Sequence, residues 1–409
     1  MTKSPSTRIE VHVELAPGTA RAGTAFVSVT RGELTTVFDY DPAYLARKEA
    51  FSLSPELSMS SGSTVVAGLP GAMADSAPDR WGRNMIKKRL QADNREQGRR
   101  GQSVTEIDYL LGVSDFTRHG ALRYCLESGA FLAPDNDVPT LIELPRLMDA
   151  ADIVDREAVG SDDLAAIKIL LDAGSGSLGG ARPKASVRDG DRLWMAKFPR
   201  VSDEWDVMAW EMTALDLAEV CGIKTPTRRL VDVAGKRVLL LERFDREVSQ
   251  RIPYISAMTL LQARDGDRRE YIEIAEALQV VGSAVRGDLQ ELWRRIAFSI
   301  AINNTDDHLR NHGFLHRGRG WRLSPVFDVN PNPDLGEHRT TSINFVTDHE
   351  NAVDALIEAA GHFDLKTESA KIIWNEVRSG VASWRAVAAK HGIDGHEIRS
   401  FSEVFESFA

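Results

Sequence analysis

A polar loop between two apolar segments is the feature that most constrains how this chain folds. Residues 292–302 form an apolar stretch with the length of a buried helix, and the apolar run Gly313-Phe314-Leu315 follows soon after. Residues 303–311 between them read Asn-Asn-Thr-Asp-Asp-His-Leu-Arg-Asn. Because both flanking segments are expected to pack into a core, the sequence predicts a polar loop that is fixed at both ends.

Three residues in and after this loop have the spacing of a phosphoryl-transfer site. Asp306 and Asn311 stand five residues apart, as do the general base and a metal-binding amide in the catalytic loop of protein kinases. Seventeen residues further on, Asp328 is flanked by apolar residues and is expected at a strand end. The spacing selects Asp306, not Asp307, as the base. His308 is expected to brace the loop. It follows the base, whereas the histidine of a typical protein kinase precedes it, and this order is more like that of lipid kinases. Taken alone, a polar helix end with capping side chains is the simpler interpretation.

The composition excludes several classes of protein. The chain has 409 residues, which is enough for two or three domains. Its net charge of -10 argues against a general nucleic-acid coat protein. The two cysteines, Cys125 and Cys221, argue against a disulfide framework and fit a reducing, cytoplasmic location. We expect no signal peptide in the polar first residues and no membrane association, because no apolar run is long enough to span a bilayer.

The first part of the chain is rich in predicted strands. Apolar and polar residues alternate over residues 8–15, which indicates a half-buried strand. Residues 24–30 and 34–40 continue as strands, and Asp41-Pro42 begins a helix as N-cap and first helical residue.

A helix predicted over residues 78–91 has a strongly basic outer face and tail. The basic residues are Arg80, Arg83, Lys87, Lys88, Arg89, Arg95, Arg99 and Arg100. A solvated helix face is the simpler interpretation, and a phosphate- or partner-binding surface is the alternative. Residues 131–139 are predicted to be a linker or a surface loop.

A glycine-rich segment over residues 174–184 precedes a predicted hairpin. Glycines let backbone amides approach a phosphate closely, although a plain flexible loop is the simpler interpretation, and a Walker A ending is absent. Residues 184–188 and 192–198 alternate as strands around the turn signal Asp189-Gly190. The return strand carries Lys197, which is costly to bury unless a nucleotide phosphate or an acid from the next helix pairs with it.

The next helix, predicted over residues 203–220 with Ser202 as its N-cap, offers that acid. Glu211 near its middle is the candidate partner of Lys197, and a surface glutamate is the alternative. Strands at 228–233 and 236–241 then lead into Glu242-Arg243-Phe244, where the chain of a two-lobed kinase would cross between lobes.

Helices dominate from residue 256 onward. They are expected at 256–263, 268–282, 288–303, 351–360, 366–378, 382–391 and 394–408, with short strands at 313–316, 321–324 and 340–345. The sequence therefore predicts an α+β, two-lobed protein-kinase-like fold of the lipid-kinase-like branch. We expect a β-rich N-terminal subdomain at 1–135, a kinase N-lobe at 136–245 and a helical C-lobe at 246–409.

These motifs in this order resemble the HipA family of serine/threonine kinases, the toxins of bacterial toxin–antitoxin modules. The resemblance rests on stretches spread over nearly the whole chain. They are residues 78–83 (Pro-Asp-Arg-Trp-Gly-Arg), 111–113, 120–124, 177–184, 196–199, 241–246, 304–311 and 325–328. The sequence departs from the family pattern at Arg182-Pro183, where other members have polar residues.

The resemblance implies a role for each matching residue. Asp306 would be the catalytic base, and Asn311 and Asp328 would bind Mg²⁺. The ATP-binding residues that it implies are Lys197, held by Glu211, the hinge residues Glu242 and Phe244, and Ser177, Gly179, Gly180 and Lys184 of the glycine-rich loop. Either Arg182 or Lys184 remains a candidate for phosphate contact. Ser177 would be autophosphorylated, which switches the kinase off.

The resemblance also implies partners. These are a small helix-turn-helix antitoxin (HipB-like), operator DNA only through that complex, and a protein substrate such as an aminoacyl-tRNA synthetase. The basic stretch at 80–100 would then be a candidate for DNA contact. The alternatives are a small-molecule or lipid kinase on the same scaffold, and a catalytically weak partner or corepressor of an antitoxin.

Overall fold

The computed structural model describes residues 6–15, 18–98, 104–126, 129–132, 138–156, 161–175, 180, 182–247 and 250–408. It divides into two compact units. Unit 1 comprises Met1–Val201 and Asp245–Ile255, and unit 2 comprises Ser202–Phe244 and Ser256–Ala409. The chain therefore crosses between the units after Val201, after Phe244 and after Ile255.

This division differs from the three domains expected from the sequence. The hairpin of β6 and β7 lies in unit 1, whereas helix α7 (Val207–Val220) and the hairpin of β8 (Arg228–Val233) and β9 (Lys236–Glu242) lie in unit 2. The sequence analysis assigned all of these elements to one N-lobe. The boundaries at 135 and 245 remain a prediction, since a lobe can be split between two compact units.

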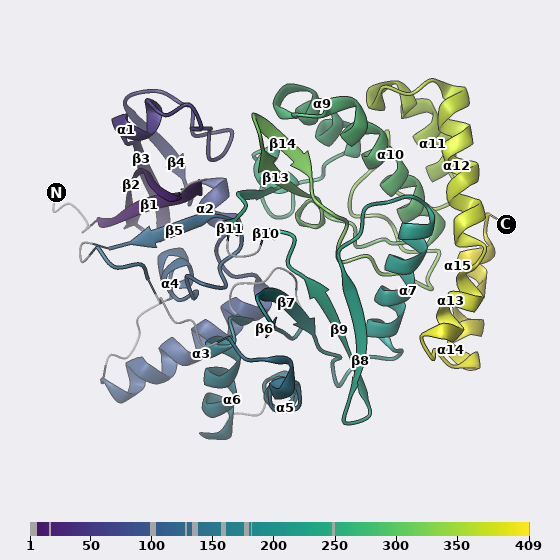
Figure 1. Cartoon of the computed structure of the whole chain (residues 1–409), viewed down its shortest axis with the longest axis horizontal. Coiled ribbons are helices and arrows are strands. Elements are labelled where there is room, and N and C mark those ends of the chain that lie inside the picture. Colours follow the sequence, from purple (N-terminus) through teal and green to yellow (C-terminus); the bar gives the residue numbers. More distant parts are fainter. Residues whose placement is uncertain are drawn as a thin grey trace. The chain divides into compact units, whose positions relative to one another are not determined.

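An antiparallel sheet forms the first part of unit 1 (Figure 1). Its strand order is β4-β3-β2-β1-β5. The strands are β1 (Thr7–Leu15), β2 (Gly18–Thr30), β3 (Glu33–Tyr40), β4 (Ser63–Ala67) and β5 (Leu122–Cys125). The predicted alternation in β1 is confirmed, because Ile9, Val11 and Val13 are fully buried while the residues between them are half-buried.

Helices and two hairpins complete the described part of unit 1. The helices are α1 (Pro42–Leu45), α2 (Gly71–Asp75), α3 (Arg80–Glu96), α4 (Glu106–Leu111), α5 (Leu144–Asp155) and α6 (Ser161–Asp172), with a 3₁₀ turn η1 (Leu141–Glu143). One hairpin joins β6 (Lys184–Asp189) to β7 (Arg192–Lys197), and the other joins β10 (Arg246–Glu247) to β11 (Gln250–Arg251).

Helix α3 begins at Arg80, two residues after the predicted start, and ends at Glu96, five residues after the predicted end. The Asp79 carboxylate caps it by accepting from the Gly82 amide at 2.9 Å, while Trp81, Met85 and Ile86 are buried. The helix continues to Glu96 because residues 91–96 contain no Gly or Pro that would end it. Arg80, Lys87 and Arg95 are exposed on it, as the solvated-face interpretation predicts, whereas Arg99 and Arg100 lie outside the described residues.

Unit 2 contains α7, the hairpin β8–β9, a second hairpin and the remaining helices. Its later strands are β13 (Gly313–Arg317) and β14 (Gly320–Leu323), while β12 (Tyr254–Ser256) spans the crossing between the units. The helices are α8 (Ala257–Leu260), α9 (Tyr271–Val281), α10 (Val285–Ala301), α11 (Ala352–Glu358), α12 (Thr367–Val381), α13 (Trp384–Lys390), α14 (Gly395–Ser400) and α15 (Ser402–Glu406), with 3₁₀ turns η3 (Leu309–Asn311) and η4 (Ala359–Phe363).

Two predicted elements of unit 2 were wrong in detail. Helix α7 is capped by Asp206, whose carboxylate accepts from the Ala209 amide at 2.9 Å, and not by Ser202. Residues 340–345 form only isolated bridges instead of a strand. The reason is that Asn344 and Phe345 have positive φ angles, 48° and 67°, which interrupt an extended backbone.

Helix α10 positions the polar loop. It is capped by no side chain at its start, but it buries Leu292, Trp293 and Ile296 and packs against α9, α11 and α12. The last turn of α10 therefore fixes the position of Asn303, the first residue of the polar loop. Within the described ranges, no helix is both long and apolar enough to cross a lipid bilayer.

Candidate active site

The loop after α10 is fixed at its start by hydrogen bonds to the helix and to a buried arginine. Asn303 ends the helix with a φ of 50°, a conformation that asparagine tolerates well. The Asn304 amide donates to the Ser299 carbonyl at 2.8 Å. Arg339, buried beside the loop, donates to the carbonyls of Ser299 and Asn304 at 3.3 and 3.2 Å.

A second segment, residues 332–341, braces the loop along its length. Asn332 donates to the Thr305 hydroxyl at 2.8 Å, and the Thr340 amide donates to the Thr305 carbonyl at 3.0 Å. The Thr341 hydroxyl donates to the Asp307 carbonyl at 2.7 Å. Sequence reasoning missed these supporting residues, because the segment has no periodic pattern that would place it beside a loop some 30 positions earlier.

Asp306 and Asp307 lie in opposite environments. Asp306 is exposed, whereas Asp307 is buried. The Asp307 carboxylate accepts from the Tyr271 hydroxyl at 2.6 Å and lies 3.0 Å from His312 Nε2. Burial opposes ionisation of Asp307, but the neighbouring His312 and the bond from Tyr271 outweigh it and lower its pKa. Asp307 is thus a structural anion, and Asp306 is the carboxylate that a substrate can reach.

The surroundings of Asp306 raise its pKa above the ordinary value for aspartate. The largest cause is partial burial of the carboxylate's surroundings, which His308 opposes. The negative charges of Asp328, Asp307 and Glu337 raise the pKa further. A carboxylate with a raised pKa is a stronger base than an ordinary aspartate.

Asn311 closes the loop on itself. Its side-chain amide donates to the Asp306 carbonyl at 3.0 Å, and its backbone amide donates to the His308 carbonyl at 2.8 Å. Because the Asn311 nitrogen is used inside the loop, the amide oxygen is the atom left to act as an acceptor or a metal ligand. The five-residue spacing between Asp306 and Asn311 therefore corresponds to a closed loop that ends in the 3₁₀ turn η3.

Asp328 is not at a strand end, as the sequence analysis expected. Strand β14 ends at Leu323, and residues 324–330 have no regular structure. Asp328 is half-buried and has a φ of 56°, a left-handed conformation that is uncommon for aspartate. The Val326 amide donates to the Lys224 carbonyl at 2.8 Å and holds this irregular segment in place.

The predicted hinge residues lie at the end of β9. The Glu242 amide donates to the Thr227 carbonyl at 2.8 Å, and both Glu242 and Phe244 are half-buried. The Phe244 ring contacts the ring of Phe327, with 5.5 Å between centroids. Phe327 precedes Asp328, so the hinge residue Phe244 contacts the neighbour of the second acid in the sequence.

Glu211 lies on α7 and is fully buried, so the alternative of a surface glutamate was wrong. Sequence reasoning could not decide between the two, because α7 is apolar around most of its circumference. A buried carboxylate in such a helix needs a positive partner to remain ionised.

Unit 1 contributes two lysines from its β6–β7 hairpin. Lys184 and Lys197 face each other across the two strands, and both are buried, with 1% and 4% exposure. Lys184 Nζ lies 3.0 Å from the Asp79 carboxylate, an ion pair that sequence reasoning missed. Of the glycine-rich loop, Gly180 has a φ of 102°, which favours glycine, while Ser177 and Gly179 lie outside the described residues.

The structure thus brings together one group of predicted residues within unit 2 and another within unit 1. Asp306 and Asn311 are joined within one loop, and Phe244 contacts Phe327, the residue before Asp328. The oxygens of an amide and a carboxylate suit Mg²⁺, which commonly takes one or two protein ligands and keeps several waters. Among the described residues there is no cluster of three or more His, Cys, Asp or Glu side chains that would form a complete metal cage.

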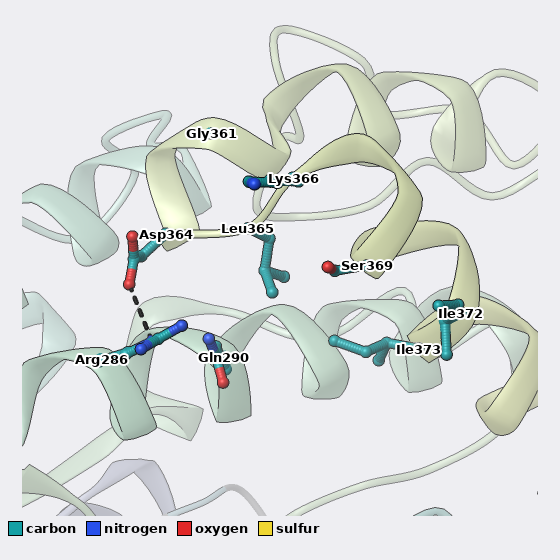
Figure 2. A pocket seen from close by; sticks show the side chains of 9 residues that line it. All are labelled: Arg286, Gln290, Gly361, Asp364, Leu365, Lys366, Ser369, Ile372 and Ile373. Carbon is teal, nitrogen blue, oxygen red and sulfur yellow. Dashed lines mark ion pairs between the residues drawn. The ribbon is translucent and has the colours of Figure 1, made fainter.

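A separate hollow in unit 2 contains none of the predicted site residues. It has a volume of about 620 Å³ and lies between the beginnings of α10 and α12 (Figure 2). Arg286 and Asp364 form an ion pair of 3.2 Å at one end of it, and Ile372 lies at the other.

Comparison with known proteins identifies the family of this chain. Residues 176–384 match the family model of the HipA-like C-terminal domain, and residues 19–100 match that of the HipA N-terminal domain. The structure is similar to HipA of Shewanella oneidensis MR-1, solved with HipB and its operator DNA, with a TM-score of 0.65. That match covers 97% of this chain and 95% of the other at 14% identity.

Two curated relatives are named as kinases. The chain is 26% identical over 311 residues to "Putative kinase Y4dM" of Sinorhizobium fredii, covering 67% of this chain and 75% of the relative. It is 24% identical over 144 residues to a "Putative kinase" of Haemophilus influenzae, covering 31% of this chain and 42% of the relative.

The fold is that of an α+β protein of the kinase-like class, which confirms the fold class predicted from the sequence. The C-terminal family model alone spans half of the chain, and the N-terminal model adds a second region in the expected order. The chain belongs to the HipA family and is a HipA-like kinase.

Proposed function

We propose that the protein is an ATP- and Mg²⁺-dependent serine/threonine protein kinase that acts as a HipA-type toxin. It transfers the γ-phosphate of ATP to a hydroxyl of a cellular protein and thereby inhibits translation or growth. The observation that carries the proposal is the contrast within the loop after α10. Asp306 is exposed and has a raised pKa, while Asp307 beside it is buried as a structural anion.

Asp306 is assigned as the base that orients the accepting hydroxyl and takes its proton. Its position is fixed because Asn311 donates to its carbonyl at 3.0 Å and residues 332–341 brace the loop. Such positioning, together with electrostatic stabilisation, supplies most of the rate enhancement in phosphoryl transfer.

Asn311 and Asp328 are assigned as the ligands of Mg²⁺. When bound, the metal supplies neutralisation of the charge on the phosphates. The remaining requirement is a positive group for the phosphates, and Lys197 is assigned to it, with Glu211 as the acid that holds Lys197. The burial of both side chains supports this pairing, since each would need an opposite charge.

The adenine is assigned to the backbone of Glu242 and Phe244. Gly179 and Gly180 are assigned to the phosphates as part of the glycine-rich loop, with either Lys184 or Arg182 as the charged residue. For Lys184, this contact would have to compete with its ion pair to Asp79, which favours Arg182 as the residue that touches phosphate. Ser177 is assigned as the autophosphorylation site that turns the kinase off.

The proposed partners are a helix-turn-helix antitoxin and, through that complex only, operator DNA. The similarity to a HipA solved with HipB and operator DNA supports this part of the proposal. The protein substrate belongs to the translation machinery, such as an aminoacyl-tRNA synthetase, and a cytoplasmic location follows from such a substrate.

The proposal is tested by incubating the purified protein with a cell lysate and ATP labelled at the γ-phosphate. Label is expected in protein bands as phosphoserine or phosphothreonine. Asp306→Asn is expected to lower the initial rate at least about 100-fold, the usual contribution of a general base, while the fold is retained. Asp334→Asn is the matched control, because Asp334 is an exposed carboxylate on the neighbouring segment and is outside the assigned site.

Three results would overturn parts of the proposal. Label in a soluble or lipid product instead of protein would assign a small-molecule or lipid kinase. No turnover of ATP would leave a catalytically weak partner of an antitoxin. Equal rates for wild type and Asp306→Asn would show that another residue is the base.

A further inference from the structure

The segment Asp245–Ile255 belongs to unit 1, and the chain passes into unit 2 at both of its ends. Residues near both ends of the segment contact the same turn, residues 116–120. At the first end, the buried Asp245 carboxylate accepts from the Gly120 amide at 2.8 Å. It also accepts from the Arg246 guanidinium at 2.7 Å. The acid therefore ties the start of the segment to the last residue of the turn.

Arg246 extends this grip to three backbone carbonyls. It donates to the carbonyls of Phe116, Arg118 and Gly120 at 3.2, 2.6 and 3.3 Å. Its side chain is only 8% exposed. A planar guanidinium spreads five N–H donors over a wide fork, whereas a lysine has three donors on a single nitrogen and cannot reach all of these acceptors together.

Tyr254 grips the same turn from the other end of the segment. Its ring stacks on the His119 ring with 3.9 Å between centroids. Gly120 has a φ of 72°, and a side-chain carbon there would approach the Cβ and backbone nitrogen of Tyr254 to 3.2 Å. Glycine at 120 is thus required both by the backbone conformation and by the close approach of Tyr254.

Each crossing leads directly to a residue of the proposed site. Phe244, the residue before Asp245, contacts Phe327 next to the assigned ligand Asp328. On the other side, the Ala257 amide donates to the His312 carbonyl at 2.7 Å, next to the assigned ligand Asn311. Residues just outside each end of the segment thus contact the sequence neighbours of the two assigned ligands.

We propose that Asp245, Arg246 and Tyr254 on the turn 116–120 form a positioning clamp that fixes the two crossings and so preorganises the nucleotide site. This inference rests on the proposed function. Ordering a flexible backbone costs free energy, and a clamp that orders the crossings before ATP arrives removes that cost from binding. The clamp residues are positioning residues, since they act through Phe244 and the turn η3.

The clamp is tested with Arg246→Met, which keeps the apolar stem and removes all donors. Amide hydrogen exchange in peptides covering residues 239–244 and 256–262 is expected to become faster by about tenfold, because the anchors of both crossings are lost. KM for ATP is expected to rise on the order of tenfold, while kcat changes by less than about twofold. A purely structural role would leave KM unchanged in the protein that remains folded.

Arg83→Met is the matched control. Arg83 also lies in unit 1, pairs with a carboxylate, Glu106, and donates to a backbone carbonyl, that of Pro78, at 3.0 Å. It is expected to leave exchange at the crossings and KM unchanged. If Arg246→Met does not fold, Arg246→Lys replaces it, since lysine can keep the ion pair to Asp245 but not all three carbonyl contacts.

Unchanged exchange at both crossings in the Arg246 variant would overturn the clamp. So would faster exchange with an unaltered KM. A wild-type protein that transfers no phosphate would refute the proposed function instead, and the exchange measurement would still decide whether the clamp orders the crossings.

Discussion

At the scale of single residues, two adjacent aspartates divide two tasks. The Asp307 carboxylate is buried, and Tyr271 and His312 contact it, whereas Asp306 is exposed. A buried carboxylate needs strong partners, and one that must accept a proton has to remain accessible. The same loop can therefore be both rigid and reactive.

Removing the buried charge is expected to affect stability more than chemistry. Asp307→Asn weakens the bond from Tyr271 and the contact with His312, so the free energy of unfolding should fall by about 2 kcal/mol. Denaturant titration measures this loss. Tyr271→Phe removes the same hydrogen bond from the other partner and should give a loss of similar sign. In contrast, Asp306→Asn should leave the unfolding free energy nearly unchanged.

The reverse pattern would contradict this division of tasks. That pattern would be an Asp307→Asn protein that is stable but transfers no phosphate, and an Asp306→Asn protein that is unstable but keeps its activity. Asp307 would then be the catalytic residue and Asp306 the structural one.

The residue spacing in the sequence was enough to propose Asp306 and Asn311, because two residues five positions apart in a loop remain near each other whatever the rest of the fold is. The supporting residues were not accessible in this way. Arg339 and Thr341 contact the loop across more than 30 positions, and the ion pair of Lys184 with Asp79 spans 105 positions. No local pattern in the sequence indicates which distant polar residues come into contact.

At the scale of elements, the hairpin β13–β14 carries a half-buried histidine. His316 faces Trp321 across the two strands, with ring centroids 5.2 Å apart. Burial lowers the pKa of His316 from 6.5 to about 4. The hairpin follows the catalytic loop directly, so its acid sensitivity bears on the site.

Stability is expected to fall in acid because of this histidine. Its pKa in the folded protein lies below its unfolded value, so its contribution is complete above about pH 6.5 and is lost as the pH falls towards about 4. His316→Gln cannot titrate and should lose less stability over this range, by up to about 3 kcal/mol. Denaturant titrations of both proteins between pH 7.5 and 4 measure the difference.

Parallel stability curves for the two proteins would contradict the lowered pKa of His316. Some loss in acid should remain in the variant, because burial also lowers the pKa of His349 to about 4.

Elements with strong local signals followed the sequence closely. The alternating pattern of β1 and the turn signal between β6 and β7 both correspond to observed strands. Elements that depend on a few backbone angles did not. The expected strand at 340–345 is interrupted by the positive φ angles of Asn344 and Phe345, and Asp328 lies beyond a strand that ends at Leu323.

At the scale of the whole molecule, the kinase-like fold could be predicted because several independent motifs occur in the expected order. The division into units could not. It depends on where the segment Asp245–Ile255 packs, and that segment returns to unit 1 through contacts with residues more than 100 positions earlier. Such contacts leave no periodic signal in either partner.

The central claim is that the site around Asp306 transfers phosphate from ATP. Intact-mass spectrometry of the purified protein after incubation with Mg-ATP tests it most directly. The wild type is expected to gain the mass of one phosphoryl group, Ser177→Ala to lose that gain, and Asp306→Asn to remain unmodified. An Asp306→Asn protein that gains the same mass at the wild-type rate would contradict the claim.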